Sequence, residues 1–195
     1  IQMENNNEKF FQKVSELLEK GRKNVKTAVN LSMVYTYFEI GRMIFEEEQN
    51  GEQRASYGKY LMNELSEYLT AQFGKGFSVT NLKQMRQFYV VYSGDKISQT
   101  VSDQFSNLPT VSTGRKFFLS WSHYLKLMRI SNMEERHFYE IEAAKNDWSL
   151  SELNRQFDSA LYERLALSTE KENVYRLAQK GQIIEKPSDA IKDPY

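Results

Sequence analysis

The chain has no cysteine and only two histidines among its 195 residues. The lack of cysteine excludes disulfide bonds, thiolate nucleophiles and zinc sites built on thiolates. His123 and His137 are the remaining nitrogen ligands, and they fall on different predicted helices with no second histidine four residues away. We therefore expect no metal site, and the sequence supports no other cofactor.

Long hydrophobic runs are also missing. No stretch approaches the roughly 20 consecutive apolar residues that a membrane span needs, and no charged-then-apolar leader resembles a signal peptide. We expect a cytoplasmic protein with no membrane partner. Ile1 and Gln2 precede Met3, and we interpret these two residues as a remnant of expression ahead of the natural start.

The common catalytic motifs are absent. Gly74 and Gly76 form a GxG without a third glycine, no GK[ST] follows, and no G-x-S-x-G occurs, so a phosphate cradle and a nucleophile elbow are unsupported. A PD-(D/E)XK nuclease needs an acid two residues before a lysine, and no lysine of this chain has one. We expect no catalytic residues here.

Negative charge is scarce in the middle of the chain. Residues 68–133 hold 8 Lys/Arg and only 2 Asp/Glu, whereas residues 1–67 hold 9 and 11 and residues 134–195 hold 9 and 13. Such a distribution indicates that a polyanion binds near the middle of the chain, because contacts between cations and phosphates release counterions and this release favours binding. Docking of the positive middle onto acidic flanks of the same or a neighbouring subunit explains the charges equally well.

Apolar residues recur at helical spacing almost throughout, and β-type alternation is hard to find. The sequence predicts a mainly α, multi-helix domain with at most a small β-hairpin. A first helix fits 8–19 and ends at Gly21, and a longer one fits 24–49, where Gly41 allows a close helix contact. Further helices are expected at 56–73, 79–92, 119–129, from a capping box at 131–134, and from a second capping box at 149–152 to about 165. Residues 93–115 are a loop or a hairpin wing.

The pair of helices at 57–92 is typical of a helix-turn-helix. The first ends at Gly74, and Ser78 is suited to cap the second. On the second helix, Leu82, Met85 and Phe88 belong to the apolar face. The opposite face carries amides and cations but no carboxylate. These side chains suit contacts in a DNA major groove, namely Thr80, Lys83, Gln84, Arg86 and Gln87. A plain solvated face is the alternative.

Other basic residues of the middle are candidates for phosphate contacts, which position a protein on DNA without specifying sequence. They are Lys75, Arg115, Lys116, Lys126 and Arg129. A second helix-turn-helix-like unit at 132–165 carries Glu152, Asp158 and Glu163 on its last helix, and these acids would repel DNA. We interpret that unit as a scaffold or a subunit interface.

Several motifs along the chain are distinctive, namely Tyr37-Phe38-Glu39-Ile40-Gly41-Arg42, Phe73-Gly74-Lys75-Gly76-Phe77-Ser78, Leu119-Ser120-Trp121-Ser122-His123-Tyr124, Trp148-Ser149 and Leu161-Tyr162-Glu163-Arg164-Leu165. Together they resemble the YhcG family of bacterial proteins. The resemblance covers nearly the whole chain. It implies a winged-helix-like, DNA-binding N-terminal domain that precedes a PD-(D/E)XK nuclease domain. Ser151 departs from the family pattern, which usually has arginine there.

The resemblance predicts residues 3–167 as the helical DNA-binding domain and residues 168–195 as a helical linker toward a nuclease domain absent from this chain. The expected partners are double-stranded DNA, that nuclease domain and, in a homodimer, a second copy. The alternative function is a protein-interaction or oligomerisation module that assembles the nuclease.

Overall fold

The computed structural model describes residues 2–50, 55–94, 115–167 and 181. Within them the chain forms seven helices and no strand: α1 (Gln2–Asn50), α2 (Ala55–Phe73), α3 (Val79–Tyr92), α5 (Trp121–Leu127), α6 (Met133–Lys145), α7 (Leu150–Asp158) and α8 (Leu161–Leu167). The predicted mainly helical fold is confirmed. Residues 95–114 of the predicted loop or hairpin wing at 93–115, and the predicted helix from residue 168, lie outside the described residues.

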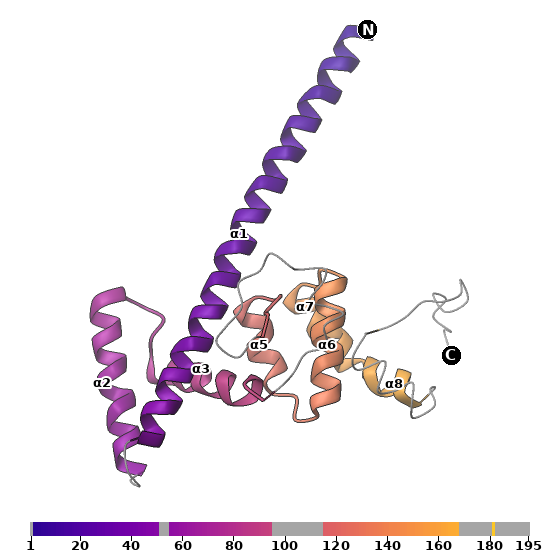
Figure 1. The fold of residues 1–195 in the computed structure, drawn as a ribbon. Helices are drawn as coiled ribbons and strands as arrows, with labels where there is room; N and C mark the ends of the chain where they lie inside the picture. The colour runs from indigo at the N-terminus through magenta and orange to yellow at the C-terminus, as the bar shows by residue number, and fades with distance from the viewer. Residues whose placement is uncertain (1, 51–54, 95–114, 168–180, 182–195) are drawn as a thin grey trace.

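Helix α1 is a single long helix whose N-terminal half stands clear of the rest of the molecule (Figure 1). The predicted break at Gly21 is wrong, because the helix continues through that residue. Side chains from 11 to 30 are all exposed, whereas the second half buries Leu31, Val34 and Phe38 against the other helices. The described part of the chain therefore consists of a helical body and one projecting helical arm.

Gly41 is the point of closest approach between α1 and α3. A Cβ atom built on Gly41 would lie 2.0 Å from the Met85 carbonyl oxygen and 2.7 Å from its carbonyl carbon. No side chain fits in that space, so the predicted close helix contact is confirmed. Glycine at this position lets α3 lie directly against α1.

Aromatic rings fill the main core, which lies where α1, α3, α5 and α6 meet. The Phe88 ring is central: its centroid lies 5.6 Å from that of Phe38, 4.9 Å from Phe117 and 5.0 Å from Tyr124. Buried rings at these spacings contribute packing energy beyond the area that they remove from water. The core thereby holds α3 by its inner face.

A smaller apolar cluster joins α2 to α1 and α3. It contains the buried residues Ile44, Met62, Leu82 and Met85. Leu65 and Leu69 of α2 pack against it and are only partly buried, while Tyr60, Tyr68 and Phe73 are exposed. The apolar side of α2 is thus buried along one edge only.

The C-terminal helices begin and end differently from the predicted pattern. Asn132, not Ser131, caps α6, because the Asn132 carboxamide oxygen accepts hydrogen bonds from the amides of Glu134 and Glu135 at 2.9 and 3.2 Å. Ser149 caps α7 as predicted, with its hydroxyl accepting from the Glu152 amide at 3.1 Å. The predicted single helix to about residue 165 is interrupted at Ala160, whose φ of 51° separates α7 from α8.

Candidate nucleic-acid interface

The turn between α2 and α3 is held by polar contacts from both helices. Gly74 and Gly76 have φ angles of 80° and 121°, which glycine adopts without the strain of a side chain. The Ser66 hydroxyl donates to the Phe77 carbonyl at 2.8 Å, and the Asn81 amide group donates to the Gly76 carbonyl at 2.9 Å. These bonds fix the direction in which α3 leaves the turn.

Ser78 caps the first turn of α3, as predicted. Its hydroxyl accepts a hydrogen bond from the Asn81 backbone amide at 3.3 Å. The cap satisfies one of the amide groups that a helix start leaves without an intrahelical partner. The start of α3 is consequently well defined relative to α2.

One face of α3 points away from the body, and we call it the α3 strip: Thr80, Lys83, Gln84 and Gln87. Thr80, Lys83 and Gln87 are exposed, and Gln84 is partly exposed. Leu82, Met85 and Phe88 of the same helix are buried. Lys75 is exposed in the turn that precedes the helix. The structure thus brings five of the predicted DNA-contact residues to the surface of one helix and its turn.

Arg86 is not available as predicted. Its side chain forms an ion pair and hydrogen bond with Glu48 of α1, and its guanidinium lies 6.0 Å from the Phe45 ring centroid. The arginine therefore links α3 to α1, and a phosphate contact would have to compete with this carboxylate. We remove Arg86 from the candidate interface.

Arg115 is also removed from the interface, because it is a core residue. Its guanidinium donates to Glu140 at 2.9 and 3.2 Å, and it stacks over the Tyr92 ring with its Cζ atom 4.3 Å from the ring centroid. Only 4% of the residue is exposed. A buried, paired arginine in this position stabilises the fold and cannot reach a phosphate on the surface.

The Tyr124 hydroxyl completes this buried polar group. It donates to the Glu140 carboxylate at 2.9 Å and accepts from the Phe118 amide at 3.1 Å. Burial raises the pKa of Tyr124 well above its ordinary value, and the neighbouring Glu140 charge raises it further. The phenol stays protonated and serves as a structural donor.

The remaining predicted phosphate contacts differ in accessibility. The Lys126 ammonium lies 4.2 Å from the Phe157 ring centroid and 4.0 Å from an Asp158 carboxylate oxygen, so it is packed against α7. Lys116 is partly exposed and Arg129 is exposed. Lys116 and Arg129 remain candidate phosphate contacts, whereas Lys126 has a structural role.

His123 is a hydrogen-bonded residue that joins two parts of the fold. Its Nε2 atom lies 2.9 Å from the Trp148 carbonyl oxygen, and Nδ1 lies 2.7 Å from the Ser120 hydroxyl. The carbonyl can only accept, so Nε2 carries a proton and donates to it. Both nitrogens are used to join the start of α5 to the turn between α6 and α7.

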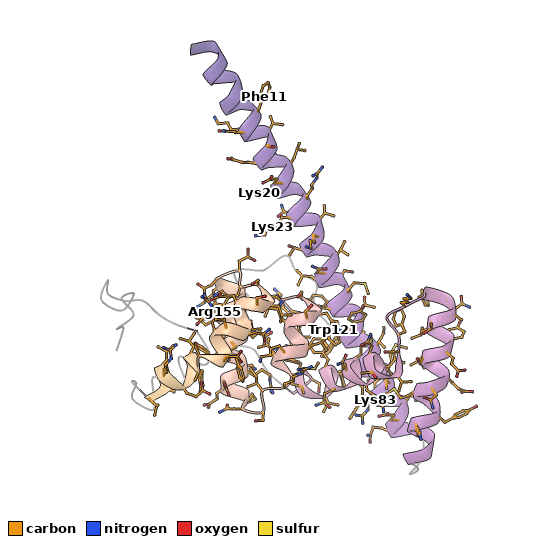
Figure 2. All side chains as sticks on the ribbon, turned by 180° about the vertical axis from the view of Figure 1, so that it is seen from behind. Phe11, Lys20, Lys23, Lys83, Trp121 and Arg155 are labelled. Atoms are coloured by element: carbon orange, nitrogen blue, oxygen red, sulfur yellow. The ribbon has the colours of Figure 1, made fainter. Side chains whose placement is uncertain are left out.

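The second helix-turn-helix-like unit carries mixed charge on its exposed surface. Arg155 pairs with Glu152 at 2.7 Å, and both lie on α7. Figure 2 shows Arg155 on the opposite side of the body from Lys83. The charge of this surface is therefore balanced internally, in contrast to the α3 strip.

Among the described residues, no group of three or more Asp, Glu and His side chains is arranged to hold a metal ion. None of the helices formed by those residues is both long and apolar enough to cross a membrane.

These features define a mainly helical domain whose α3 strip presents one cation and two amides without a carboxylate. Residues 13–164 match the family model described as the DUF1016 N-terminal domain, and the chain belongs to this family. The resemblance to the YhcG family is thereby confirmed.

Among curated proteins, the chain is similar to "Putative nuclease YhcG" of Escherichia coli (strain K12). The two are 34% identical over 197 residues, which cover 93% of this chain and 52% of the relative. The chain thus spans about half the length of the curated relative that it matches. No solved structure matches it.

Proposed function

We propose that this chain is the DNA-binding, non-catalytic N-terminal module of a bacterial nuclease that acts in the cytoplasm, and that the α3 strip is its contact surface for duplex DNA. The observation that carries the proposal is the α3 strip itself, a helix face with an accessible cation and amides and no acid. Support for the nuclease context comes from the matched relative, whose printed name is that of a nuclease.

The chemistry of the strip fits a major groove. Glutamine can make a bidentate contact to adenine, and lysine can reach guanine or a phosphate. Gln84 and Gln87 lie three residues apart, so they point in similar directions along the helix. Among the described residues, no hydrogen bond or ion pair engages the side chains of Thr80, Lys83, Gln84 or Gln87. The strip therefore keeps its donors and acceptors for an external ligand.

The way α3 is mounted also supports this role. Its inner face is held by the aromatic core, its first turn by Ser78, and its flank by the pair between Arg86 and Glu48. A helix held on three sides loses little conformational freedom when it binds, so less of the contact energy is spent on ordering. We further propose that catalysis resides in the part of the protein that this chain does not include.

The test is a titration of fluorescent duplex DNA at two salt concentrations, with the double variant Lys75→Glu and Lys83→Glu. Both substitutions lie on the surface and leave the core unchanged. Each phosphate contact contributes about 0.9 to the slope of log affinity against log salt, so the variant should lower the magnitude of that slope by about two. The parent should bind and leave the duplex intact in the presence of Mg²⁺.

The matched control is the double variant Arg155→Glu and Arg164→Glu, which changes the net charge equally on the opposite side of the body. It should reduce affinity only slightly. Equal weakening by both variants would show a nonspecific charge effect. Failure of the parent to bind duplex DNA, or binding that the α3 variant leaves unchanged, would contradict the proposal.

A further inference from the structure

The arm of α1 carries an apolar stripe that the body does not cover. Phe11, Leu18 and Val25 are 64%, 60% and 65% exposed, and Val14 and Leu17 are exposed as well. Figure 2 shows Phe11 on the part of the arm farthest from the body. An isolated helix with this much exposed apolar surface is only marginally stable in water, so the arm needs a partner.

The stripe has the spacing of a coiled coil. Phe11, Val14, Leu18, Gly21, Val25 and Ala28 occupy alternating steps of three and four residues, which are the a and d positions of a heptad. The charged residues of this segment lie at other heptad positions: Lys13, Glu16, Glu19, Lys20, Arg22, Lys23 and Lys26. The sequence prediction missed this stripe because a helix end was placed at Gly21.

The stripe has defined limits and faces away from the body. On the body side of the arm, the Lys23 ammonium pairs with Asp147 at 2.5 Å, and Lys23 is on the opposite face of α1 from Val25 and Gly21. Beyond Val29 the outward positions become polar, with Ser32 and Thr36 both exposed. The apolar surface is thus about 27 Å long at 1.5 Å per residue and is open to a second helix.

We propose that the occupant is the same arm of a second copy of this chain, packed in an antiparallel two-stranded coiled coil. The side-chain sizes match only in that direction. Antiparallel pairing about the middle of the stripe places Phe11 opposite Ala28, Leu18 opposite Gly21, and Val14 opposite Val25. Parallel pairing instead places Phe11 against Phe11 and leaves a void between two copies of Gly21.

The charges favour the same direction. The outer half of the stripe, residues 11–19, carries Lys13, Glu16 and Glu19 and is weakly acidic, whereas the inner half, residues 20–28, carries Lys20, Arg22, Lys23 and Lys26 and no acid. Antiparallel packing puts the weakly acidic half of one arm beside the basic half of the other, whereas parallel packing puts the two basic halves side by side. The arm is therefore complementary to itself in both volume and charge.

The mass of the chain in solution tests the interface. The parent chain has a mass of 23.0 kDa. Light scattering over protein concentrations from about 1 to about 100 µM should give twice that mass at the highest concentrations, since dimerisation follows mass action. Leu18→Glu with Val25→Glu should give the monomer mass throughout. Gln12→Glu with Thr27→Glu adds the same charge to the other face of the arm and should leave the dimer intact.

Introduced cysteines test the direction, because the chain has none of its own. A mixture of Val14→Cys and Val25→Cys chains should form the mixed disulfide under mild oxidation. Val14→Cys alone should not, because two copies of residue 14 lie about 16 Å apart in the antiparallel pair, beyond the reach of a disulfide.

A parent that stays monomeric over the whole series, or a stripe variant that dimerises like the control, would overturn the proposal. A Val14→Cys disulfide without the mixed one would overturn the antiparallel arrangement. The interface does not involve the α3 strip, so the Lys75→Glu and Lys83→Glu variant should remain dimeric. The mass measurement therefore tests the arm dimer alone, and the DNA titration tests the α3 strip alone.

Discussion

At the scale of single residues, Arg115 and Glu140 form an ion pair inside the aromatic core. Their side chains are 1% and 2% exposed, and the Tyr124 hydroxyl donates to the same carboxylate. Taking two charges out of water is costly, and the pair compensates for that cost only while both members are present. The stability of the body should therefore depend on the pair as a unit.

We expect Arg115→Met to lower the free energy of unfolding by about 3 to 5 kcal/mol, because it leaves a buried carboxylate without its charge partner. Chemical denaturation monitored by circular dichroism measures this. The double variant Arg115→Met with Glu140→Leu should lose much less, since neither charge remains. Additive losses from the two single substitutions would argue against a coupled pair.

The same pair shows what local sequence reasoning cannot reach. Arg115 and Glu140 are 25 positions apart, and Arg86 and Glu48 are 38 apart. Nothing in the neighbourhood of either arginine identifies its partner, so the sequence predicts both as surface cations. Lys83, which no described acid engages, is placed on the surface correctly, because helical periodicity alone decides its side of α3.

At the scale of elements, the crossing of α1 and α3 depends on Gly41. We expect Gly41→Ala to destabilise the body by about 1 to 3 kcal/mol, because the new methyl group overlaps the Met85 carbonyl and forces the helices apart. Thermal unfolding followed by circular dichroism reports the loss.

Gly58→Ala is the matched control. A Cβ atom there lies 3.4 Å from the nearest Glu48 carboxylate oxygen, an ordinary contact. Alanine in a helix interior is favoured over glycine by about 1 kcal/mol, so this variant should be at least as stable as the parent. A similar loss in both variants would mean that the crossing at Gly41 is looser than described.

Helix positions followed from periodicity, but helix ends did not. Gly21 lowers helix propensity without removing a hydrogen bond, so strong helix formers on both sides carry α1 through it. The end of α7 coincides with a positive φ at Ala160 and is followed by a tertiary contact. The Tyr162 amide, in the first turn of α8, donates to the Tyr139 hydroxyl at 3.2 Å. That contact joins residues 23 positions apart and leaves no mark on the local pattern.

At the scale of the whole molecule, the chain separates two surfaces along one helix. The arm of α1 carries the apolar stripe, and the buried half of α1 holds α3 through Gly41, Phe38 and the Glu48 pair. The helix is not interrupted between these two surfaces, because α1 is continuous from Gln2 to Asn50.

Because α1 is one continuous helix, it rigidly connects the arm to the body. It therefore fixes the angle between a partner bound on the arm and the α3 strip. Each residue inserted into an α-helix rotates one end relative to the other by 100° and moves the ends 1.5 Å further apart. One alanine inserted after Asn30 should therefore leave dimerisation and single-site DNA affinity intact. The insertion should change which distance between two binding sites on one duplex gives the tightest binding. A series of duplexes that differ in the distance between their two sites measures this change. Seven inserted alanines rotate the arm by about 700° relative to the body. This rotation returns the two surfaces to within about 20° of their original angle and moves them roughly 10 Å further apart.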